Sequence, residues 1–209
     1  MSQLIFDIGA NVGNFTEACL NKIPDSKIIA VEPNNFLIEH LRKRFKLNSV
    51  QILNFLVSNQ TDIFVPFYEN KTADTISTAS TDWIYNSRFS HNSQWLPPID
   101  KQTITIDKMI SLYGIPDLIK IDVEGYELQV LRGLTRKVNK LCFEWAEEGK
   151  ESIVESCSYL ENLGYQDFGY ILGDDYLREP TRWVSKTELL KIMNMQPERK
   201  SAWGMIWVR

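Results

Sequence analysis

Short apolar runs alternate with segments of helical periodicity in the first part of the chain. The runs Leu4–Ile8, Lys27–Val31 and residues 51–57 are each bounded by polar or turn residues, which is typical of buried strands. Between them, apolar positions three and four residues apart predict helices, the second over residues 36–45. The order strand, helix, strand, helix, strand predicts a parallel sheet with helices on both faces, joined by right-handed crossovers.

A long interruption separates this part of the chain from a second alternating part. Residues 71–100 follow a strand at 63–67, show no regular period, are rich in Ser, Thr and Asn, and contain several aromatic side chains. Irregular segments of this length are usually functional or disordered, and the aromatic residues favour function. Beyond them we expect strands at 103–106, 117–123, 138–145, 165–171 and 202–208, with helices at 107–113, 128–131, 152–163 and 186–193. Because the sequence shows no repeat and no linker, we expect residues 1–209 to form one domain with an insertion at 71–100.

Composition and charge fit a soluble globular protein. Apolar residues make up 44% and charged residues 24% of the 209 positions. The formal charge of −4 argues against a general nucleic-acid coat, and no apolar run approaches the ~20 residues of a membrane span. Three widely spaced cysteines without a C-x-x-C pair predict reduced thiols, and no signal peptide precedes the first strand. We therefore expect a cytoplasmic protein whose partners include neither nucleic acid nor membrane.

A glycine loop follows the first strand, in the sequence D-I-G-A-N-V-G-N-F-T at residues 7–16. Gly9 and Gly13 allow the backbone to approach a ligand at a helix N-terminus, with a spacing that differs from dinucleotide sites. Asp7 would repel a pyrophosphate but suits an amino or sulfonium group. Glu32 ends the second strand, where an acid binds ribose hydroxyls. S-adenosylmethionine, a nucleoside that carries an amino acid and no phosphate, fits this combination of residues. The alternative is a tight turn between strand and helix with acids on its surface.

A second group of charges lies on the strand at 117–123. Lys120, Asp122 and Glu124 alternate, so they share one face near the carboxyl end of the strand, where the ligand crevice opens. Asp122 could take a hydroxyl proton, orient the nucleophile or hold the sulfonium side of the cofactor. The alternative is an ion pair from Lys120 to Asp122 or Glu124 that supports the loop. Glu127 is expected on the surface of the following helix.

The remaining candidate residues surround this edge of the sheet. Glu144 ends the next strand, and with Asp122 it could bind a divalent cation, but a solvated acidic edge is favoured and no metal is expected. His91 is the candidate general base, since His40 lies on a helix rich in basic residues. Residues 71–100 also offer aromatic and polar groups for an acceptor, namely Trp83, Tyr85, Arg88, His91 and Trp95.

Four motifs together resemble the FkbM-type methyltransferases. They are the glycine loop, V-E-P-N at residues 31–34, T-I-D at 105–107, and P-D-L-I-K-I-D-V-E-G-Y-E at 116–127 followed by V-L-R-G. The resemblance covers residue 4 to about residue 145. It implies a Rossmann-like α/β fold of class I, with a seven-stranded sheet in the order 3-2-1-4-5-7-6 and strand 7 antiparallel. It also implies S-adenosylmethionine-dependent transfer to a hydroxyl oxygen, with S-adenosylhomocysteine as product.

The resemblance further assigns residues to the cofactor and the reaction. Those implied for the cofactor are Asp7, Gly9, Ala10, Asn11, Gly13, Glu32, Pro33, Leu56, Val57, Ser58, Asn59 and Asp122. The candidate catalytic residues are Asp122, His91, Glu124 and Lys120, with Glu144 placed among the acceptor-binding residues. Many members carry an N-terminal extension, whereas this chain starts almost at its first strand, which favours one domain of a longer polypeptide.

The expected function is methyl transfer to a sugar hydroxyl, on a deoxyhexose such as rhamnose within a glycan. An RNA ribose 2′-O-methyltransferase is the first alternative; Lys120 and Asp122 fit it, but the acidic total charge does not. A non-catalytic binding module with the same fold is the second, and the acids Asp7, Glu32 and Asp122 argue against it. The oligomeric state and the choice between a free and a glycan-linked acceptor stay open.

Overall fold

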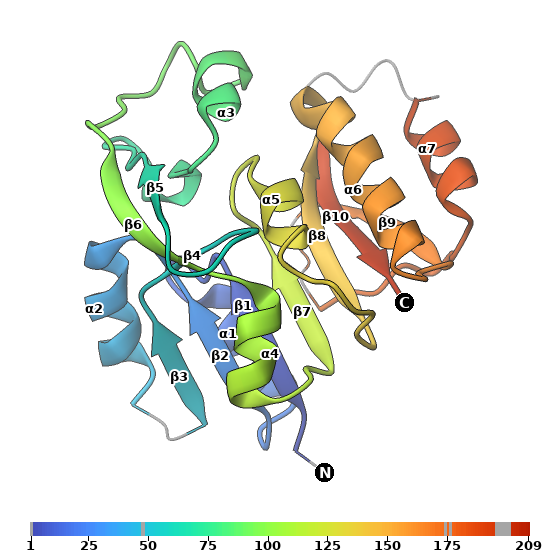
Figure 1. The fold of residues 1–209 in the computed structure, drawn as a ribbon, viewed down its shortest axis with the longest axis horizontal. Coiled ribbons are helices and arrows are strands. Elements are labelled where there is room, and N and C mark those ends of the chain that lie inside the picture. The colour runs from blue at the N-terminus through green and yellow to red at the C-terminus, as the bar shows by residue number, and fades with distance from the viewer. Residues whose placement is uncertain (1, 47–48, 174, 176, 195–201) are drawn as a thin grey trace.

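A seven-stranded sheet organises the chain (Figure 1). The computed structural model describes residues 2–46, 49–173, 175, 177–194 and 202–209. The strands lie in the order β3 (Val50–Leu53), β2 (Lys27–Val31), β1 (Leu4–Ile8), β7 (Leu118–Ile121), β8 (Leu141–Ala146), β10 (Trp203–Val208) and β9 (Phe168–Leu172). Neighbouring strands pair in parallel except β10, which is antiparallel to β8 and β9. This confirms the sheet order 3-2-1-4-5-7-6 with an antiparallel seventh strand.

Helices cover both faces of this sheet, as the alternating sequence pattern predicted. They are α1 (Asn14–Lys22), α2 (Asn35–Arg44), α4 (Ile106–Tyr113), α5 (Glu127–Leu131), α6 (Lys150–Asn162) and α7 (Lys186–Asn194), with a 3₁₀ turn η2 (Glu147–Gly149) before α6. In Figure 1, α4 and α6 lie in front of the sheet and α1 lies behind it. Side chains cap the starts of α2 and α4: that of Asn34 accepts a bond from the Phe36 N–H, and that of Thr105 from the Lys108 N–H.

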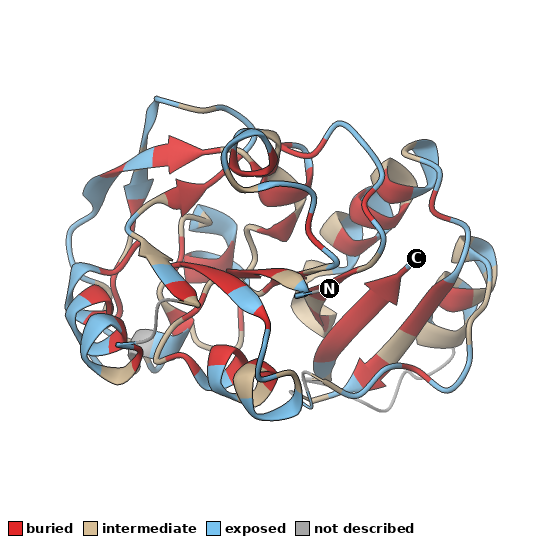
Figure 2. Ribbon diagram, turned by 90° about the horizontal axis from the view of Figure 1, so that it is seen from below, coloured by how far each residue is buried: buried red, intermediate tan, exposed pale blue. Residues whose placement is uncertain are grey.

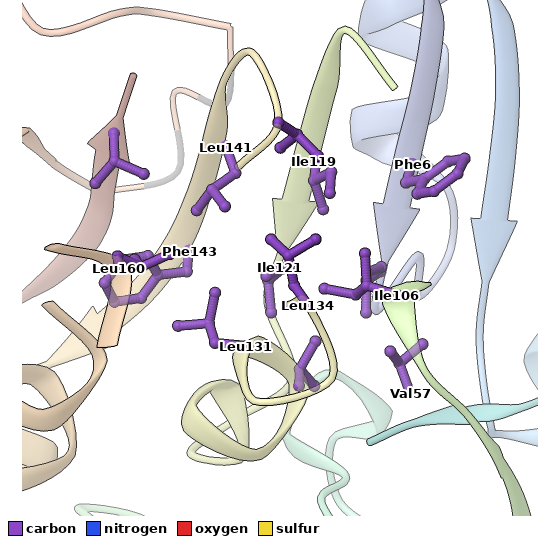
Figure 3. Packing of buried hydrophobic residues seen from close by; sticks show 14 of the residues in the cluster. Phe6, Val57, Ile106, Ile119, Ile121, Leu131, Leu134, Leu141, Phe143 and Leu160 are labelled. Carbon is purple, nitrogen blue, oxygen red and sulfur yellow. The ribbon is translucent and has the colours of Figure 1, made fainter. Parts of the chain in front are cut away.

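Two apolar clusters hold the layers together. Neighbouring residues of β1 point to opposite faces, so that Ile5 packs with α1 and α2 whereas Phe6 packs on the side of α4 and α6. Figure 3 shows the larger cluster, with side chains from the sheet, the helices and the loops between them. Figure 2 shows the strands largely buried, while exposed residues lie on outer helix turns and loops. The three cysteines are buried and free, in agreement with the prediction of reduced thiols.

A small second sheet lies above the carboxyl ends of the main strands (Figure 1). Its strands are β4 (Leu56–Val57), β6 (Ile99–Ile104) and β5 (Phe64–Phe67), which mostly flank the predicted insertion at 71–100. The insertion itself contains η1 (Asp74–Ile76) and α3 (Thr81–Asn86). The prediction of an irregular segment missed α3, because six residues are too short to show a helical period. The single strand predicted at 51–57 is divided, and the side chain of Asn54 bonds the carbonyls of Glu32 and Pro33 at the break.

Among the residues that the structure describes, no helix combines the length and apolarity that a membrane crossing requires.

Candidate active site

A cleft of ≈ 350 Å³ lies between the carboxyl ends of the central strands and the insertion. Its volume falls in the range of about 300–1,000 Å³ that is usual for ligand sites. It brings together most of the residues predicted from the sequence. Those that line it are Gly9, Ala10, Asn11, Glu32, Pro33, Leu56, Val57, Trp83, Arg88, Lys120, Asp122, Glu124 and Glu144.

The glycine loop lies directly against the turn that follows β7. Gly9 has φ +75°, and a Cβ placed on it would lie 1.8 Å from the backbone oxygen of Asp122. A side chain at this position would therefore push the two loops apart, which explains the requirement for glycine. Gly9 and Ala10 both donate their N–H to the carbonyl of Val31, so that the loop is tied to the end of β2.

Lys120 is an internal cation that joins three parts of the site. Its Nζ donates to the Gly9 carbonyl at 2.7 Å and lies 3.5 Å from Asp7 Oδ1 and 3.4 Å from Asp122 Oδ2. The residue is 3% exposed, so these contacts compensate a charge that is almost removed from water. The ion pair between Lys120 and Asp122 that the sequence left as an alternative is present, and both residues also line the cleft.

Asp7 lies beneath the cleft rather than in its lining. The residue is fully buried, and its Oδ2 accepts a bond from the Thr16 hydroxyl at 2.6 Å. Burial raises the pKa of Asp7, and the neighbouring Lys120 ammonium opposes this shift. Asp7 thus contacts Lys120 and the start of α1, whereas the resemblance implied that it binds the cofactor.

Glu32 presents a carboxylate at the end of β2. Its Oε2 accepts the Asn11 N–H at 2.8 Å and its Oε1 accepts the Asn34 N–H at 2.9 Å. Burial raises the pKa of Glu32 to about 7, although these two backbone bonds favour the charged form. Each carboxylate oxygen has a second lone pair, so Glu32 can accept bonds from two adjacent hydroxyls of a ribose. Beside it, Pro33, Leu56 and Val57 form an apolar wall suited to a flat base.

Three carboxylates meet at the other end of the cleft. Asp122, Glu124 and Glu144 each offer an oxygen, and these oxygens all lie within 4.8 Å of one another. Burial raises the pKa of Glu124 and of Glu144 well above the usual value, and the nearby Asp122 charge raises both further. A group of acids this close favours a positive charge or a proton between them. The sulfonium of the implied cofactor meets this condition, as would a metal ion.

Aromatic side chains surround these acids on the side of the insertion. The ring of Trp83 lies 6.0 Å from that of Phe89, and Trp203 from the start of β10 reaches the same cleft. Arg88 also lines the cleft and is paired with Glu148, through bonds of 2.6 Å from Nε and 2.7 Å from Nη2. This bidentate pair joins the insertion to the segment after β8 and fixes the aromatic wall against the main sheet.

Several predicted residues lie outside the lining that the described part of the chain forms. Gly13 is buried against the end of α2, where a Cβ would come 2.4 Å from the Phe45 ring. Ser58 is buried and its hydroxyl is 3.1 Å from that of Tyr126, whereas Asn59 is exposed.

Three residues proposed for acceptor binding also lie outside the cleft lining. Tyr85 is 75% exposed on the outer side of α3, and His91 is exposed in the turn that follows. Trp95 is half-buried, and its backbone forms a bridge with Asn70 within the insertion. The predicted general base His91 is therefore not among the groups that meet at the acids.

Glu127 is buried, whereas the sequence predicted it on the surface of a helix. The residue is 7% exposed, and its Oε1 accepts the N–H groups of Val123 at 3.1 Å and Gly125 at 3.2 Å. An acid in the first turn of a helix that reaches back to preceding N–H groups is a known capping pattern, so the signal was available. Trp203 was missed because nothing near it in the sequence connects the last strand with the cleft.

Comparison with known proteins places these features in a family. The model of the family described as the methyltransferase FkbM domain matches residues 7–166. The curated malonyl-[acyl-carrier protein] O-methyltransferase 2 of Ilyobacter polytropus is 32% identical over 97 residues, which are 45% of this chain and 35% of that protein.

Two crystal structures have a similar fold. The methyltransferase FkbM from Methylobacillus flagellatus matches all of this chain and 44% of its own, with a TM-score of 0.59 and 16% identity. The precorrin-6y C5,15-methyltransferase from Geobacter metallireducens matches all of this chain and 80% of its own, with a TM-score of 0.52 and 12% identity. This chain thus spans less than half the length of the curated relative and of the similar FkbM structure.

Proposed function

Because the chain belongs to the FkbM methyltransferase family, we propose that it transfers the methyl group of S-adenosylmethionine to a sugar hydroxyl, on a deoxyhexose such as rhamnose within a glycan. The observation that carries this proposal is the pairing of two sites in one cleft. Glu32 can accept ribose hydroxyls at one end, and three acids meet at the other.

The cofactor supplies an electrophilic methyl group on a positive sulfur when it is bound. Glu32 would hold the ribose, the wall beside Pro33 would cover the base, and the Gly9 loop would face the amino-acid part. The carboxylates of Asp122 and Glu124 would then lie beside the positive sulfur. These residues fit the cofactor. Among the described residues that line the cleft, Glu32 would meet the ribose hydroxyls, and the three acids at the other end would meet the positive sulfur.

Proton removal is the second task of the site. As the acceptor oxygen forms a bond to the methyl carbon and the carbon–sulfur bond breaks, the hydroxyl proton must leave. We assign Glu124 as the proton acceptor, because its carboxylate lines the cleft beside Asp122 and Glu144, and because burial and the Asp122 and Glu127 charges raise its pKa. Asp122 is shared with Lys120 and is better suited to orienting the hydroxyl and the sulfonium.

The walls of the cleft support a neutral, hydroxyl-rich acceptor. Trp83, Phe89 and Trp203 offer apolar faces that can cover a sugar ring, while acids accept its hydroxyls. An RNA phosphate would be repelled by three carboxylates. The same repulsion argues against a carboxylate acceptor, such as the malonyl group named for the Ilyobacter polytropus relative.

An acceptor screen with a labelled methyl donor, read by mass spectrometry, tests the proposal. We expect methylated product from deoxyhexose glycans in amounts that are insensitive to moderate salt, and little from RNA. Asp122→Asn should lower turnover by roughly 100-fold or more while acceptor affinity changes little. Methylation of RNA with steep salt dependence, or equal turnover by Asp122→Asn, would reject the assignment.

A further inference from the structure

The turn that carries Glu124 has an unusual backbone. Glu124 has φ +57° and the following Gly125 has φ +83°, so two successive residues lie in the left-handed region. A residue with a side chain adopts this conformation only where its surroundings impose it, and such positions gather at functional sites. The contacts around the turn show what imposes it here.

Glu127 holds the turn from the side of α5. Its Oε1 accepts the N–H of Val123 and the N–H of Gly125, which are the residues on either side of Glu124. Both bonds go to one buried oxygen, so they fix the two peptide groups at a set separation. Glu124 lines the cleft, whereas Glu127 does not.

Thr78 holds the same turn from the insertion. Its hydroxyl donates to the Glu124 carbonyl at 2.7 Å, and the residue is fully buried. The backbone of Thr78 is fixed in turn by two bonds with Tyr68, one in each direction. Gly125 also lies under Trp83, where a Cβ would come within 2.9 Å of the indole. The turn is therefore clamped between two elements that are far apart in the sequence.

We propose that Thr78 and Glu127 are positioning residues that hold the Glu124 carboxylate at the point of methyl transfer. This inference rests on the proposed function. Neither residue contacts the reacting atoms; each fixes a backbone group next to Glu124. The residues before Thr78, namely Thr75, Ile76 and Ser77, line the same cleft.

Two pairs of variants test the clamp. Thr78→Val keeps the shape but loses the hydroxyl, and Thr78→Ser keeps the hydroxyl. Glu127→Ala loses the acceptor, and Glu127→Gln keeps one oxygen for the two N–H groups. We expect Thr78→Val and Glu127→Ala to lower kcat by roughly 10- to 100-fold, since small misplacements near the reaction are this costly. Acceptor KM and S-adenosylhomocysteine affinity should stay within about twofold, and Thr78→Ser and Glu127→Gln should recover most of kcat.

Controls and independent measurements keep the outcomes distinct. Thr81→Val and Glu151→Gln change exposed residues of the same types and should leave kcat unaltered. Two results would overturn the inference, provided that the wild-type protein methylates an acceptor. One is full kcat in Thr78→Val and Glu127→Ala, and the other is a loss of thermal stability or acceptor affinity alone in these variants. If the wild type binds S-adenosylhomocysteine but methylates no hydroxyl, the proposed function fails, and hydrogen exchange then decides on the clamp. Unchanged protection of the Val123 and Gly125 amides in both variants would overturn it.

Discussion

Replacement of Glu32 by glutamine tests the cofactor end of the cleft. Glu32→Gln keeps the size of the side chain but removes its charge and exchanges one acceptor oxygen for an NH₂ group. Both carboxylate oxygens already accept backbone N–H groups, from Asn11 and Asn34. The new NH₂ group would therefore face an N–H donor, and one ribose hydroxyl would lose its acceptor.

The magnitude follows from the kind of bond lost. Hydrogen bonds to a charged group contribute about 1.5–3 kcal/mol. Glu32→Gln should therefore weaken the binding of S-adenosylhomocysteine by roughly 10- to 150-fold. Glu69→Gln is a matched control, because Glu69 is 4% exposed against 5% for Glu32 but lies outside the lining of the cleft.

The pH dependence of binding gives a second, independent signal. Burial raises the pKa of Glu32 to about 7, so the free protein carries this group mostly protonated below neutral pH and mostly charged above it. If the charged form binds the ribose, wild-type affinity should rise about tenfold between about pH 6 and pH 8, and Glu32→Gln should not show this component. Comparison of the two proteins removes contributions from the other acids.

Titration calorimetry with S-adenosylhomocysteine at constant ionic strength measures both effects. Thermal melting of each variant shows whether a loss of affinity comes from a loss of folded protein. An affinity of Glu32→Gln within about twofold of wild type, or the same pH dependence in both proteins, would refute the role of Glu32 in holding the ribose.

Three further predictions follow from the acceptor end. Burial raises the pKa of Glu144 in the folded protein above its unfolded value, so its contribution to stability is present at low pH and is lost as pH rises. Glu144→Gln should therefore raise the melting temperature more at about pH 8 than at about pH 5, and an equal change at both pH values would contradict this. His91→Ala should keep wild-type turnover, because His91 is exposed and outside the cleft lining; a large loss would restore it as the base. Trp83→Ala should lower the melting temperature, since truncation of a buried indole costs about 3–5 kcal/mol. Trp203→Ala should leave the melting temperature nearly unchanged and raise the acceptor KM, because Trp203 is partly exposed. An unchanged KM in Trp203→Ala would exclude stacking of the acceptor on this ring.

The main sheet could be predicted because parallel strands buried on both faces are short apolar runs. Leu4–Ile8 and Lys27–Val31 have the predicted bounds in the structure. Gly9 and Glu32 could be placed for the same reason, since a residue that directly follows such a strand lies at the ligand edge. The site was thus most predictable where its residues are tied to strand ends.

The site residues that could not be predicted depend mostly on contacts between distant parts of the chain. Trp203 reaches the cleft only because β10 pairs with β8, and Thr78 meets Glu124 only because the insertion folds back over the sheet. His91 was proposed from its chemistry alone, and nothing in the local pattern could show that its turn faces outward. Glu127 is a different case: its bonds to the Val123 and Gly125 N–H groups are local, so the capping pattern could have placed it correctly.

Methylation of a defined glycan is the decisive test of whether this chain transfers a methyl group to a sugar hydroxyl. The protein is incubated with S-adenosylmethionine and an oligosaccharide that ends in rhamnose, and the product is analysed by mass spectrometry, with Asp122→Asn as control. We expect the wild type to add one methyl group to a sugar oxygen, and Asp122→Asn to form this product roughly 100-fold more slowly or not at all. Absence of a methylated sugar from a panel of deoxyhexose acceptors, in a preparation that binds S-adenosylhomocysteine, would contradict it.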